Sequence, residues 1–431
     1  MSVRELTCDV LVIGGGAGGL SAAVSAADHG ASVIIVERED ELGGILNQCI
    51  HNGFGLHRFG EELTGPEFAA RDIVKVEASD RISVELGCSV LSLAREDDGT
   101  IVATVSGLEM GLAHVRCGAV VLACGCRERT RGQINIAGGR PSGVFTAGSA
   151  QKLINIDGAL VGKRVVILGS GDIGLIMARR MTWEGAKVLM VCELAAEPGG
   201  LRRNIAQCLD DNNIPLYLST TVTQVFGKTR LEAVELADVD PATMQPIPGT
   251  QRRVECDTLL LSVGLIPENE VAKTIGVEID RATSGPAVDE SLATNVPGIF
   301  VAGNELHVHD LADFVSEEGE QAGANAAAYA LGKRAAATCE IEVVKGENVG
   351  SITPQHITGS SDGVTIRFRP RSRVQGAQIL VKSGDKVIKK ARRLIVVPSE
   401  MQTIELKPAD LEGVEGTIEV SCTAAPARKG A

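Results

Sequence analysis

Two glycine-rich segments, each followed by an acidic residue, carry the clearest chemical signal in the sequence. Gly14–Gly19 is followed by Glu37, and Gly169–Gly174 is followed by Glu193. Glycines at such positions let the backbone approach a pyrophosphate at a helix N-terminus, where unpaired N–H groups and the helix dipole favour anions. An acid roughly 20 residues further on can accept hydrogen bonds from a ribose. Each segment therefore predicts a dinucleotide-binding site.

The elements expected around both segments form the same strand–turn–helix–strand unit. A glycine turn alone is weak evidence, because tight turns between packed elements also need glycine; the complete unit is what favours a nucleotide. In both units the acid stands at the end of the second strand. The expected strands and helix of the first unit cover 8–13, 20–29 and 31–36. In the second unit the expected strands cover 164–168 and 187–192, and the turn over 169–174 opens a helix that runs to about 183.

Further similarity between the two halves indicates a duplicated domain rather than a solenoid. Residues 120–125 and 259–264 are similar apolar strands, each preceded by a β-rich stretch that predicts a meander. A later strand over 298–304 and a helix over 314–331 are too short to fold alone, so we expect the chain to return there to its first domain. The predicted fold class is α/β, with two Rossmann-like dinucleotide-binding domains, the second inserted in the first.

The last part of the chain has a different character. Short alternating strands such as 365–369 and 394–397 lie among polar turns without a helical period, which predicts a β-sandwich-like domain and a frayed tail over 426–431. We place the first domain at 1–155 and 285–335, the inserted domain at 156–284 and the C-terminal domain at 340–431.

Composition excludes several classes of function. The net charge of -13 and the 3% of aromatic residues argue against a nucleic-acid partner, which would need a basic surface and stacking side chains. No apolar run is long enough for a transmembrane helix, and no signal peptide is visible. The 11 cysteines are scattered, without metal-ligand spacing, so we expect reduced thiols, no metal and a cytoplasmic location.

The sequence resembles the flavoproteins with two dinucleotide-binding domains, the group of glutathione and thioredoxin reductases. The resemblance spans about residues 7–332 and includes the strand turn Ala123–Gly125, its echo at Val263–Gly264 and the late motif Thr294–Asn304. It implies FAD in the first domain and a nicotinamide dinucleotide in the second. Glu193 would repel a 2′-phosphate, which favours NAD over NADP, although Arg202 and Arg203 follow it.

The resemblance and the two fingerprints together give the expected cofactor contacts. Gly303 and Asn304 are expected at the flavin ribityl and pyrophosphate, with Ser316 in a helix that points at the flavin pyrimidine. The full FAD set is Gly14, Gly16, Ala17, Gly19, Glu37, Arg38, Gly43, Gly44, Val90, Ala123, Gly125, Gly303, Asn304 and Ser316. The NAD set is Gly169, Gly171, Asp172, Ile173, Gly174, Glu193 and Gly264.

The resemblance fails at the catalytic dithiol. Disulfide reductases carry either CxxxxC after a Gly-Gly such as Gly43-Gly44 or CxxC in the inserted domain. In this chain the segment after Gly43-Gly44 holds a single cysteine, Cys49, and there is no CxxC in the sequence. GGILNQCIHNGFG, CGCRERTRG, GVFTAGSAQ and NELHVHD resemble bacterial FAD- and NAD-dependent oxidoreductases found beside glycerol-3-phosphate dehydrogenase. These are related to α subunits of sarcosine, opine and proline oxidases, and the resemblance implies a partner dehydrogenase or small electron-transfer subunit.

Four residues are candidates for chemistry at the flavin. Cys49 and His51 follow the Gly-Gly, and His307 and His309 follow the late flavin motif. A histidine near Cys49 could hold a thiolate or protonate a reduced flavin, but hydrogen bonding and packing without chemistry are equally compatible with the pattern. A shared metal site of the four residues is a minor alternative.

The favoured hypothesis is an oxidoreductase that exchanges hydride with NAD(H) and passes electrons through FAD to or from a partner subunit or small acceptor. One alternative is a stand-alone NADH oxidase or disulfide reductase that uses Cys49. Another is a non-enzymatic redox sensor in which nucleotide binding controls docking. A homo-oligomer is compatible with each of these hypotheses.

Overall fold

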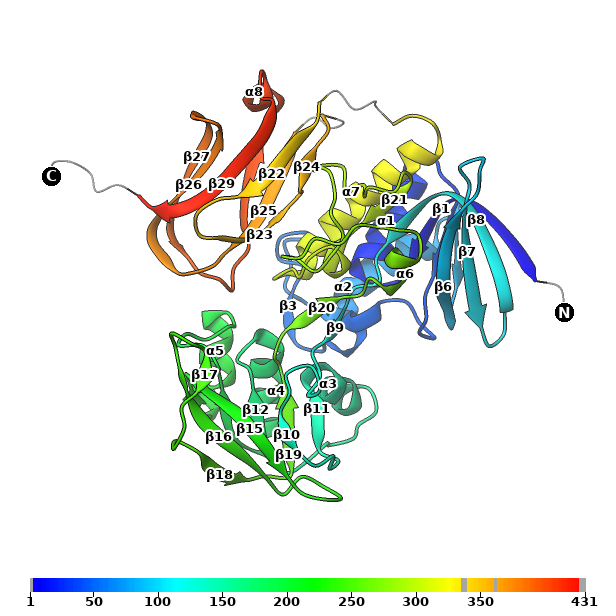
Figure 1. Ribbon diagram of the computed structural model, residues 1–431. Helices are drawn as coiled ribbons and strands as arrows, with labels where there is room; N and C mark the ends of the chain where they lie inside the picture. The colour runs from blue at the N-terminus through cyan, green and yellow to red at the C-terminus, as the bar shows by residue number, and fades with distance from the viewer. Residues whose placement is uncertain (1–2, 335–338, 360–362, 426–431) are drawn as a thin grey trace. The chain divides into compact units, whose positions relative to one another are not determined.

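The computed structural model describes residues 3–334, 339–359 and 363–425. The chain forms two compact units, one of Met1–Cys126 with Pro267–Ala431 and one of Arg127–Ile266 (Figure 1). It passes between them on two short strands that pair with each other, β9 (Cys126–Glu128) and β20 (Leu265–Pro267). The predicted frayed tail, 426–431, lies outside the described residues.

A seven-stranded sheet organises the N-terminal part of the first unit. Strands β5, β2, β1, β8 and β21 are parallel neighbours, whereas β6 and β7 join the first part of β8 in an antiparallel meander. Val10–Ile13 in β1 is buried on both faces, as in a central parallel strand. The strands are β1 (Arg4–Ile13), β2 (Val33–Val36), β5 (Ile82–Glu85), β6 (Cys88–Arg95), β7 (Ile101–Gly107), β8 (Gly111–Leu122) and β21 (Ile299–Val301).

Helices α1 and α7 of the first unit pack closely against each other (Figure 1). A Cβ atom on Gly319 would lie 2.2 Å from the carbonyl oxygen of Gly18, and one on Gly323 would lie 2.1 Å from that of Ala22. Only glycine therefore permits this approach of the two backbones. The helices of this part are α1 (Ala17–Asp28), α2 (Gly65–Glu77), α6 (Glu270–Thr274) and α7 (Ala312–Ala330), with a small hairpin of β3 (Asn52–Phe54) and β4 (Leu63–Thr64).

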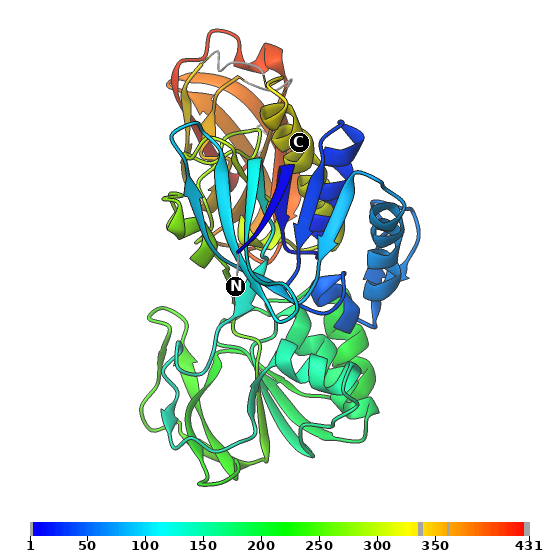
Figure 2. The same cartoon turned by 90° about the vertical axis from the view of Figure 1, so that its right-hand side faces the viewer.

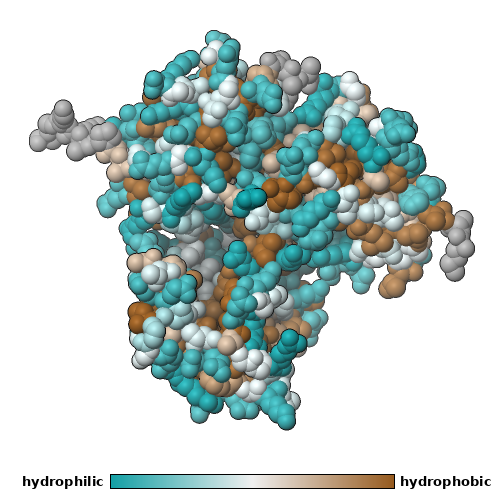
Figure 3. Space-filling model, viewed as in Figure 1, coloured by the Kyte–Doolittle hydropathy of each residue, from teal (hydrophilic) through white to brown (hydrophobic). Residues whose placement is uncertain are grey.

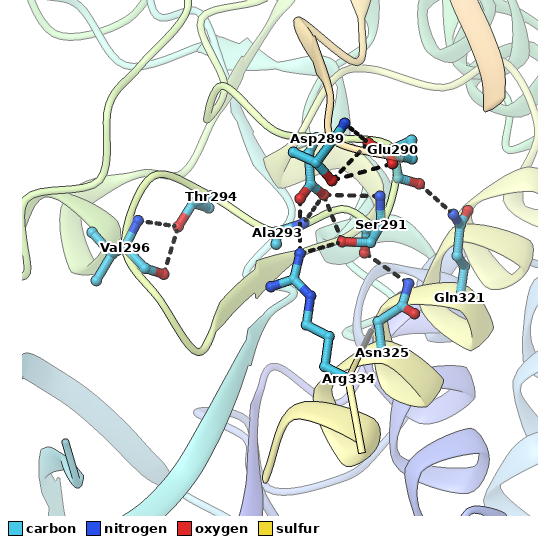
Figure 4. A network of polar contacts seen from close by, with 10 residues as sticks. Asp289, Glu290, Ser291, Ala293, Thr294, Val296, Gln321, Asn325 and Arg334 are labelled. Carbon is cyan, nitrogen blue, oxygen red and sulfur yellow. Dashed lines mark hydrogen bonds and ion pairs between the residues drawn. The ribbon is translucent and has the colours of Figure 1, made fainter. Parts of the chain in front are cut away.

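Polar contacts fix the segment before β21 against α7 (Figure 4). The side-chain amide of Gln321 donates a hydrogen bond to the carbonyl of Glu290 at 2.7 Å. Arg334, just beyond the helix, pairs with Asp289 at 2.8 Å. The chain that returns from the inserted unit is thus attached to the helix as well as to the sheet.

The second unit combines a parallel sheet, with helices on one side, and an antiparallel sheet on the other (Figure 2). Alternation along β12 explains this layering, because Val165 and Ile167 pack with the helices and Val166 and Leu168 with the antiparallel strands. The parallel sheet holds β11 (Val144–Thr146), β19 (Thr258–Leu261), β12 (Arg164–Leu168), β13 (Lys187–Cys192) and β14 (Leu216–Tyr217). The antiparallel strands are β15 (Thr220–Phe226), β16 (Ala233–Asp240), β17 (Gln245–Pro246) and β18 (Arg252–Glu255), and the short β10 (Ala137–Gly138) joins β15 in parallel. The helices are α3 (Ala147–Asn155), α4 (Asp172–Trp183) and α5 (Arg202–Cys208).

The C-terminal domain consists of two sheets around one apolar core. Val364, Ile366 and Phe368 of β25 point into this core, and the residues between them face the other way. One sheet holds β24 (His356–Ile357), β22 (Ile341–Lys345), β29 (Gly416–Ala424), β26 (Val374–Ser383) and β27 (Lys386–Val396). The other holds β23 (Val349–Thr353), β25 (Val364–Pro370) and β28 (Gln402–Leu406), and α8 (Pro408–Leu411) precedes β29.

The predicted fold class is confirmed, with two α/β units, one inserted in the other, and a C-terminal β-domain. The short helix α8 was not predicted, because four residues are too few to show a helical period. The inserted unit spans Arg127–Ile266, whereas the sequence placed the nucleotide-binding insertion at 156–284. The domain limits given from the sequence, 1–155 with 285–335, 156–284 and 340–431, stay a prediction.

On the face shown in Figure 3, hydrophobic residues form small separate groups among hydrophilic ones. Within the described residues, we find no helix with both the length and the apolar character that a membrane crossing requires.

Candidate functional site

The first glycine turn connects β1 to α1 and leaves room in front of the helix. Gly14 has φ +103°, and a Cβ atom there would lie 2.4 Å from the carbonyl oxygen of Ala123. A Cβ atom on Gly19 would lie 1.8 Å from the carbonyl oxygen of Gly14. Gly16, the N-cap of α1, differs because a Cβ atom on it would meet nothing within 4 Å. The fold itself requires Gly14 and Gly19, whereas Gly16 borders open space.

Glu37, the acid after β2, is hydrogen-bonded to this turn. One oxygen of Glu37 accepts the backbone N–H of Gly15 at 2.6 Å, and the other accepts that of Glu39 at 2.8 Å. Each carboxylate oxygen has a second lone pair, so Glu37 keeps acceptor capacity for a ribose hydroxyl. The amide contacts hold the carboxylate beside the glycine turn.

The second glycine turn repeats this arrangement in the other unit. Gly169 has φ +98°, and a Cβ atom on it would lie 2.0 Å from the carbonyl oxygen of Ser262. Glu193 accepts the backbone N–H of Ser170 at 2.9 Å, as Glu37 accepts that of Gly15. Both turns thus use the same turn-to-acid hydrogen bond.

Other predicted residues of the second turn lie at the start of α4. Gly171 is its N-cap, and a Cβ atom there would make only an ordinary contact, 3.4 Å from Ser262 Oγ. Asp172 accepts the backbone N–H of Leu201 at 2.9 Å. The remaining predicted residues of this unit are Ile173 and Gly174 within α4 and Gly264 (φ +104°) just after β19.

Several predicted FAD contacts gather at the first turn. The backbone N–H of Gly43 donates to the carbonyl of Gly15 at 2.8 Å, and a Cβ atom on Gly44 would lie 3.1 Å from Gly16 Cα. Ser316, fully buried in α7, donates to the carbonyl of Ala17 at 3.4 Å. Gly43 and Gly44, which follow β2, and Ser316 in the N-terminal part of α7 therefore meet at the N-terminus of α1.

The other predicted FAD residues occupy different surroundings. Val90 lies in the meander, paired with Val105, and the exposed Arg38 lies 3.9 Å from Glu39. Asn304 accepts the backbone N–H of His309 at 3.0 Å, so its side chain fixes the loop after the flavin motif. Gly125 (φ +72°) follows β8, and Gly303 (φ +70°) begins the short helix η3 (Gly303–Glu305).

Cys49 and His51 follow the short helix η1 (Gly44–Gln48). Burial raises the pKa of the Cys49 thiol to about 12, so the thiol is protonated at neutral pH. A ring nitrogen of His51 lies 2.9 Å from the carbonyl oxygen of Asn52, and the ring packs against Phe54 at 5.3 Å. This environment opposes thiolate chemistry at Cys49, because the thiolate is the nucleophilic form.

His307 and His309 lie in a buried cluster that also contains Glu318 of α7. Nε2 of His307 is 2.8 Å and Nε2 of His309 is 3.2 Å from the same oxygen of Glu318. Within the described residues this is the one group of three side chains with a metal-ligand arrangement, and it includes neither Cys49 nor His51. The structure thus unites two of the four candidates and leaves the other two elsewhere.

Electrostatics in the cluster favour an ionised carboxylate. Burial raises the pKa of Glu318, but the charges and hydrogen bonds of His309 and His307 outweigh it and hold that pKa well below its usual range. Burial lowers the pKa of His307, although Glu318 acts in the opposite direction. Arg367 of the C-terminal domain lies 3.5 Å from the same oxygen of Glu318.

Sequence reasoning missed Glu305, which follows the predicted flavin residue Asn304. Glu305 is fully buried, and one of its oxygens accepts the backbone N–H of Cys124 at 2.5 Å. Its other oxygen has no hydrogen-bond partner among the described residues. Burial first, and then the carboxylate of Glu268, raise its pKa to about 8. Its place beside Gly303-Asn304 was the available signal, but burial was not visible in the sequence.

Comparisons with known proteins support the same fold. The family model described as pyridine nucleotide-disulphide oxidoreductase matches residues 8–322. An opine oxidase subunit of Agrobacterium tumefaciens (strain Ach5) is 26% identical over 330 residues, which cover 70% of this chain and 64% of that protein. The mitochondrial dihydrolipoyl dehydrogenase of Caenorhabditis elegans is 29% identical over 344 residues, which cover 72% of this chain and 66% of that protein. The chain thus spans just under two thirds of the length of these two relatives.

Solved structures add a likeness of fold alone. The thioredoxin reductase of T. acidophilum superposes with a TM-score of 0.60 at 24% identity, covering 76% of this chain and 99% of that chain. The L-proline dehydrogenase of P. horikoshii has a TM-score of 0.55 at 19% identity, covering 78% of this chain and 58% of that chain.

Proposed function

This chain belongs to the pyridine nucleotide-disulphide oxidoreductase family, and on that premise we propose that it is an FAD-dependent oxidoreductase that exchanges hydride with NAD(H). Electrons then pass between the flavin and a partner subunit or small acceptor, without a dithiol in this chain. The observation that carries the proposal is the repeated turn-to-acid hydrogen bond, Gly15 with Glu37 and Ser170 with Glu193. Two sites of the same construction suit two dinucleotides.

The first site fits FAD by its shape and its donors. The open space at Gly16 lies at the N-terminus of α1, where no side chain caps the helix. Unpaired N–H groups there suit a pyrophosphate, and Glu37 is placed for the adenosine ribose. Bound FAD supplies reversible acceptance of a hydride. The chain's own part is to bind and orient the cofactor and to position protons near it.

An outside electron acceptor follows from the state of Cys49. A disulfide reductase needs two thiols or a reactive thiolate, whereas no CxxxxC follows Gly43-Gly44 and burial raises the pKa of the Cys49 thiol to about 12. The opine oxidase relative is, by its name, one subunit of an assembly. A partner subunit is therefore the proposed route by which electrons leave or enter.

Anaerobic reduction tests this function directly. Purified protein is expected to be yellow, and NADH should bleach its flavin without oxygen. Cys49→Ser should leave the rate of bleaching and of NADH–acceptor turnover within about twofold, because the thiol takes no part in either. Cys339→Ser serves as the thiol control, because Cys339 lies just before β22 and its thiol donates to the carbonyl of Ile357 at 3.7 Å. Failure of NADH to bleach the flavin would contradict the proposal, and loss of turnover in Cys49→Ser alone would favour the disulfide-reductase alternative.

The charge of Glu193 is expected to set the preference for NADH over NADPH. Glu193→Gln keeps a hydrogen-bond acceptor near Ser170 but removes the repulsion of a 2′-phosphate. The ratio of kcat/KM for NADH to that for NADPH should fall roughly tenfold, equivalent to about 1.4 kcal/mol. Glu37→Gln is the matched control from the first turn, and it should change flavin retention but not this ratio. An unchanged ratio in Glu193→Gln would place nucleotide selection elsewhere.

A further inference from the structure

The strand β25 presents two arginines to the loop that follows the flavin motif. Its alternation sends Ile366 and Phe368 into the C-terminal core and leaves Arg367 and Arg369 on the opposite face. Arg367 lies 3.5 Å from Glu318, and Arg369 donates to the carbonyl of Val308 at 2.9 Å. Arg367 thus contacts the cluster of His307, His309 and Glu318, and Arg369 contacts the loop 303–310.

The second arginine fixes the end of this loop. Arg369 forms an ion pair with Asp310, whose other oxygen accepts the backbone N–H of Met401 at 2.7 Å. Both oxygens of the Asp310 carboxylate therefore bind residues of the C-terminal domain. A further contact of the C-terminal domain is with the segment before β21, where the side chain of Glu290 accepts the backbone N–H of Thr358 at 2.8 Å.

Glu318 needs a permanent positive neighbour. Its side chain is 0% exposed, and its second oxygen accepts the backbone N–H of Gly303 at 3.1 Å. A buried carboxylate without a countercharge is costly. The charges of His307 and His309 depend on a proton, whereas a guanidinium stays charged at all ordinary pH values. Arg367, only 10% exposed at its side chain, supplies that charge.

We propose that Arg367 is a positioning residue of the flavin site, through which the C-terminal β-domain holds Glu318 and the Gly303 turn in their binding geometry. The proposal rests on the proposed function, since it takes Gly303 as part of the flavin site. Arg367 neutralises Glu318, Glu318 holds the N–H of Gly303, and Arg369 holds the end of the same loop. The C-terminal domain is thereby part of the cofactor site rather than an appendage.

A bound metal ion is the competing explanation of the cluster. Imidazole nitrogens and a carboxylate are common ligands of zinc. Arg367 argues against it, because a guanidinium 3.5 Å from the shared oxygen of Glu318 would repel a second cation. The buried carboxylate thus already has the guanidinium as a permanent countercharge.

The test uses the whole FAD-loaded chain and four variants, with a fifth, His309→Ala, for the zinc measurement alone. Arg367→Met removes the charge but keeps a long side chain, and Arg367→Lys restores it. Arg367→Met combined with Glu318→Gln removes both charges of the pair. Arg371→Met is the matched control, because this exposed arginine donates to Val349 within the C-terminal domain. The measurements are the Kd for FAD, hydrogen exchange of 303–310, the flavin midpoint potential and zinc uptake.

Arg367→Met is expected to raise the Kd for FAD at least tenfold, to speed hydrogen exchange of 303–310 and to lower the flavin potential. The potential falls because the uncompensated carboxylate disfavours the negative charge of reduced flavin. Arg367→Lys and the double variant should recover most of the affinity, and Arg371→Met should match the parent.

Three results would overturn the proposal. One is Arg367→Met with parental affinity, exchange and potential; another is a double variant no better than the single one. The third is tight uptake of one zinc ion by the parent that His309→Ala abolishes. Failure of NADH to reduce the parent's flavin would instead count against the proposed function, while affinity and exchange would still decide the role of Arg367.

Discussion

Gly16→Val protein is expected to fold normally and to purify without flavin. The backbone at Gly16 has φ −82°, which valine adopts readily, and a Cβ atom there meets nothing within 4 Å. The new side chain would instead occupy the space proposed for the pyrophosphate at the N-terminus of α1. Loss of the phosphate contacts should weaken FAD binding at least 100-fold, about 3 kcal/mol. Absorbance near the flavin bands, with circular dichroism for the fold, measures both outcomes.

Gly171→Val is the reciprocal variant in the second unit, since its backbone is also ordinary (φ −63°) and a Cβ atom fits at 3.4 Å from Ser262. It should stay yellow but lose bleaching by NADH at concentrations that saturate the parent. Gly19→Ala, whose Cβ atom would lie 1.8 Å from a carbonyl oxygen, should fail to fold and so separates steric damage from cofactor loss. If the Gly16→Val protein retained its full FAD content, the first glycine turn would not be part of the flavin site.

Glu305→Gln protein is expected to be more stable than the parent at pH 8 and nearly equal to it at pH 5. Burial raises the pKa of Glu305 from 4.5 to about 8, so folding favours its neutral form. The stability that this neutral carboxyl supports is complete below pH 4.5 and is lost as pH rises toward about 8. Each pH unit in this window costs about 1.4 kcal/mol, so the full difference is roughly 3–5 kcal/mol. Glutamine keeps the shape and an acceptor for the N–H of Cys124 without the charge.

Thermal unfolding of both proteins between pH 5 and pH 8 measures this difference, as a gap in Tm that widens with pH. Glu270→Gln is the control, because Glu270 is exposed and forms an ion pair with Lys273 at the surface. A gap that is the same at every pH, or that narrows as pH rises, would show that Glu305 is ionised in the folded protein.

Local pattern made the two nucleotide-binding units predictable. The strand Arg164–Leu168, the helix ending at Trp183 and the strand Lys187–Cys192 were each predicted at their observed bounds. Their signals lie within about 30 residues, where glycine turns and apolar runs dictate structure directly. The C-terminal β-domain was predicted by the same alternation of apolar residues.

The partners of the candidate site were not predictable in this way. His307 and His309 were singled out in the sequence, but Glu318 lies in a helix and Arg367 in another domain. Nothing local distinguishes Arg367 from the neighbouring Arg369 and Arg371, since only the folded strand decides which side chain meets a buried carboxylate. Likewise the sequence shows Glu305 as one acid among many, and its raised pKa arises from burial.

The paired connector strands β9 and β20 have a consequence for how such a chain could arise. The inserted unit leaves after β8 and returns before β21, and these two strands are themselves neighbours in the host sheet. Entry and exit of the guest therefore lie side by side, so the host sheet keeps every strand pairing whether or not the guest is present. A duplicated gene segment inserted at this point would have cost the ancestral fold little more than one opened loop.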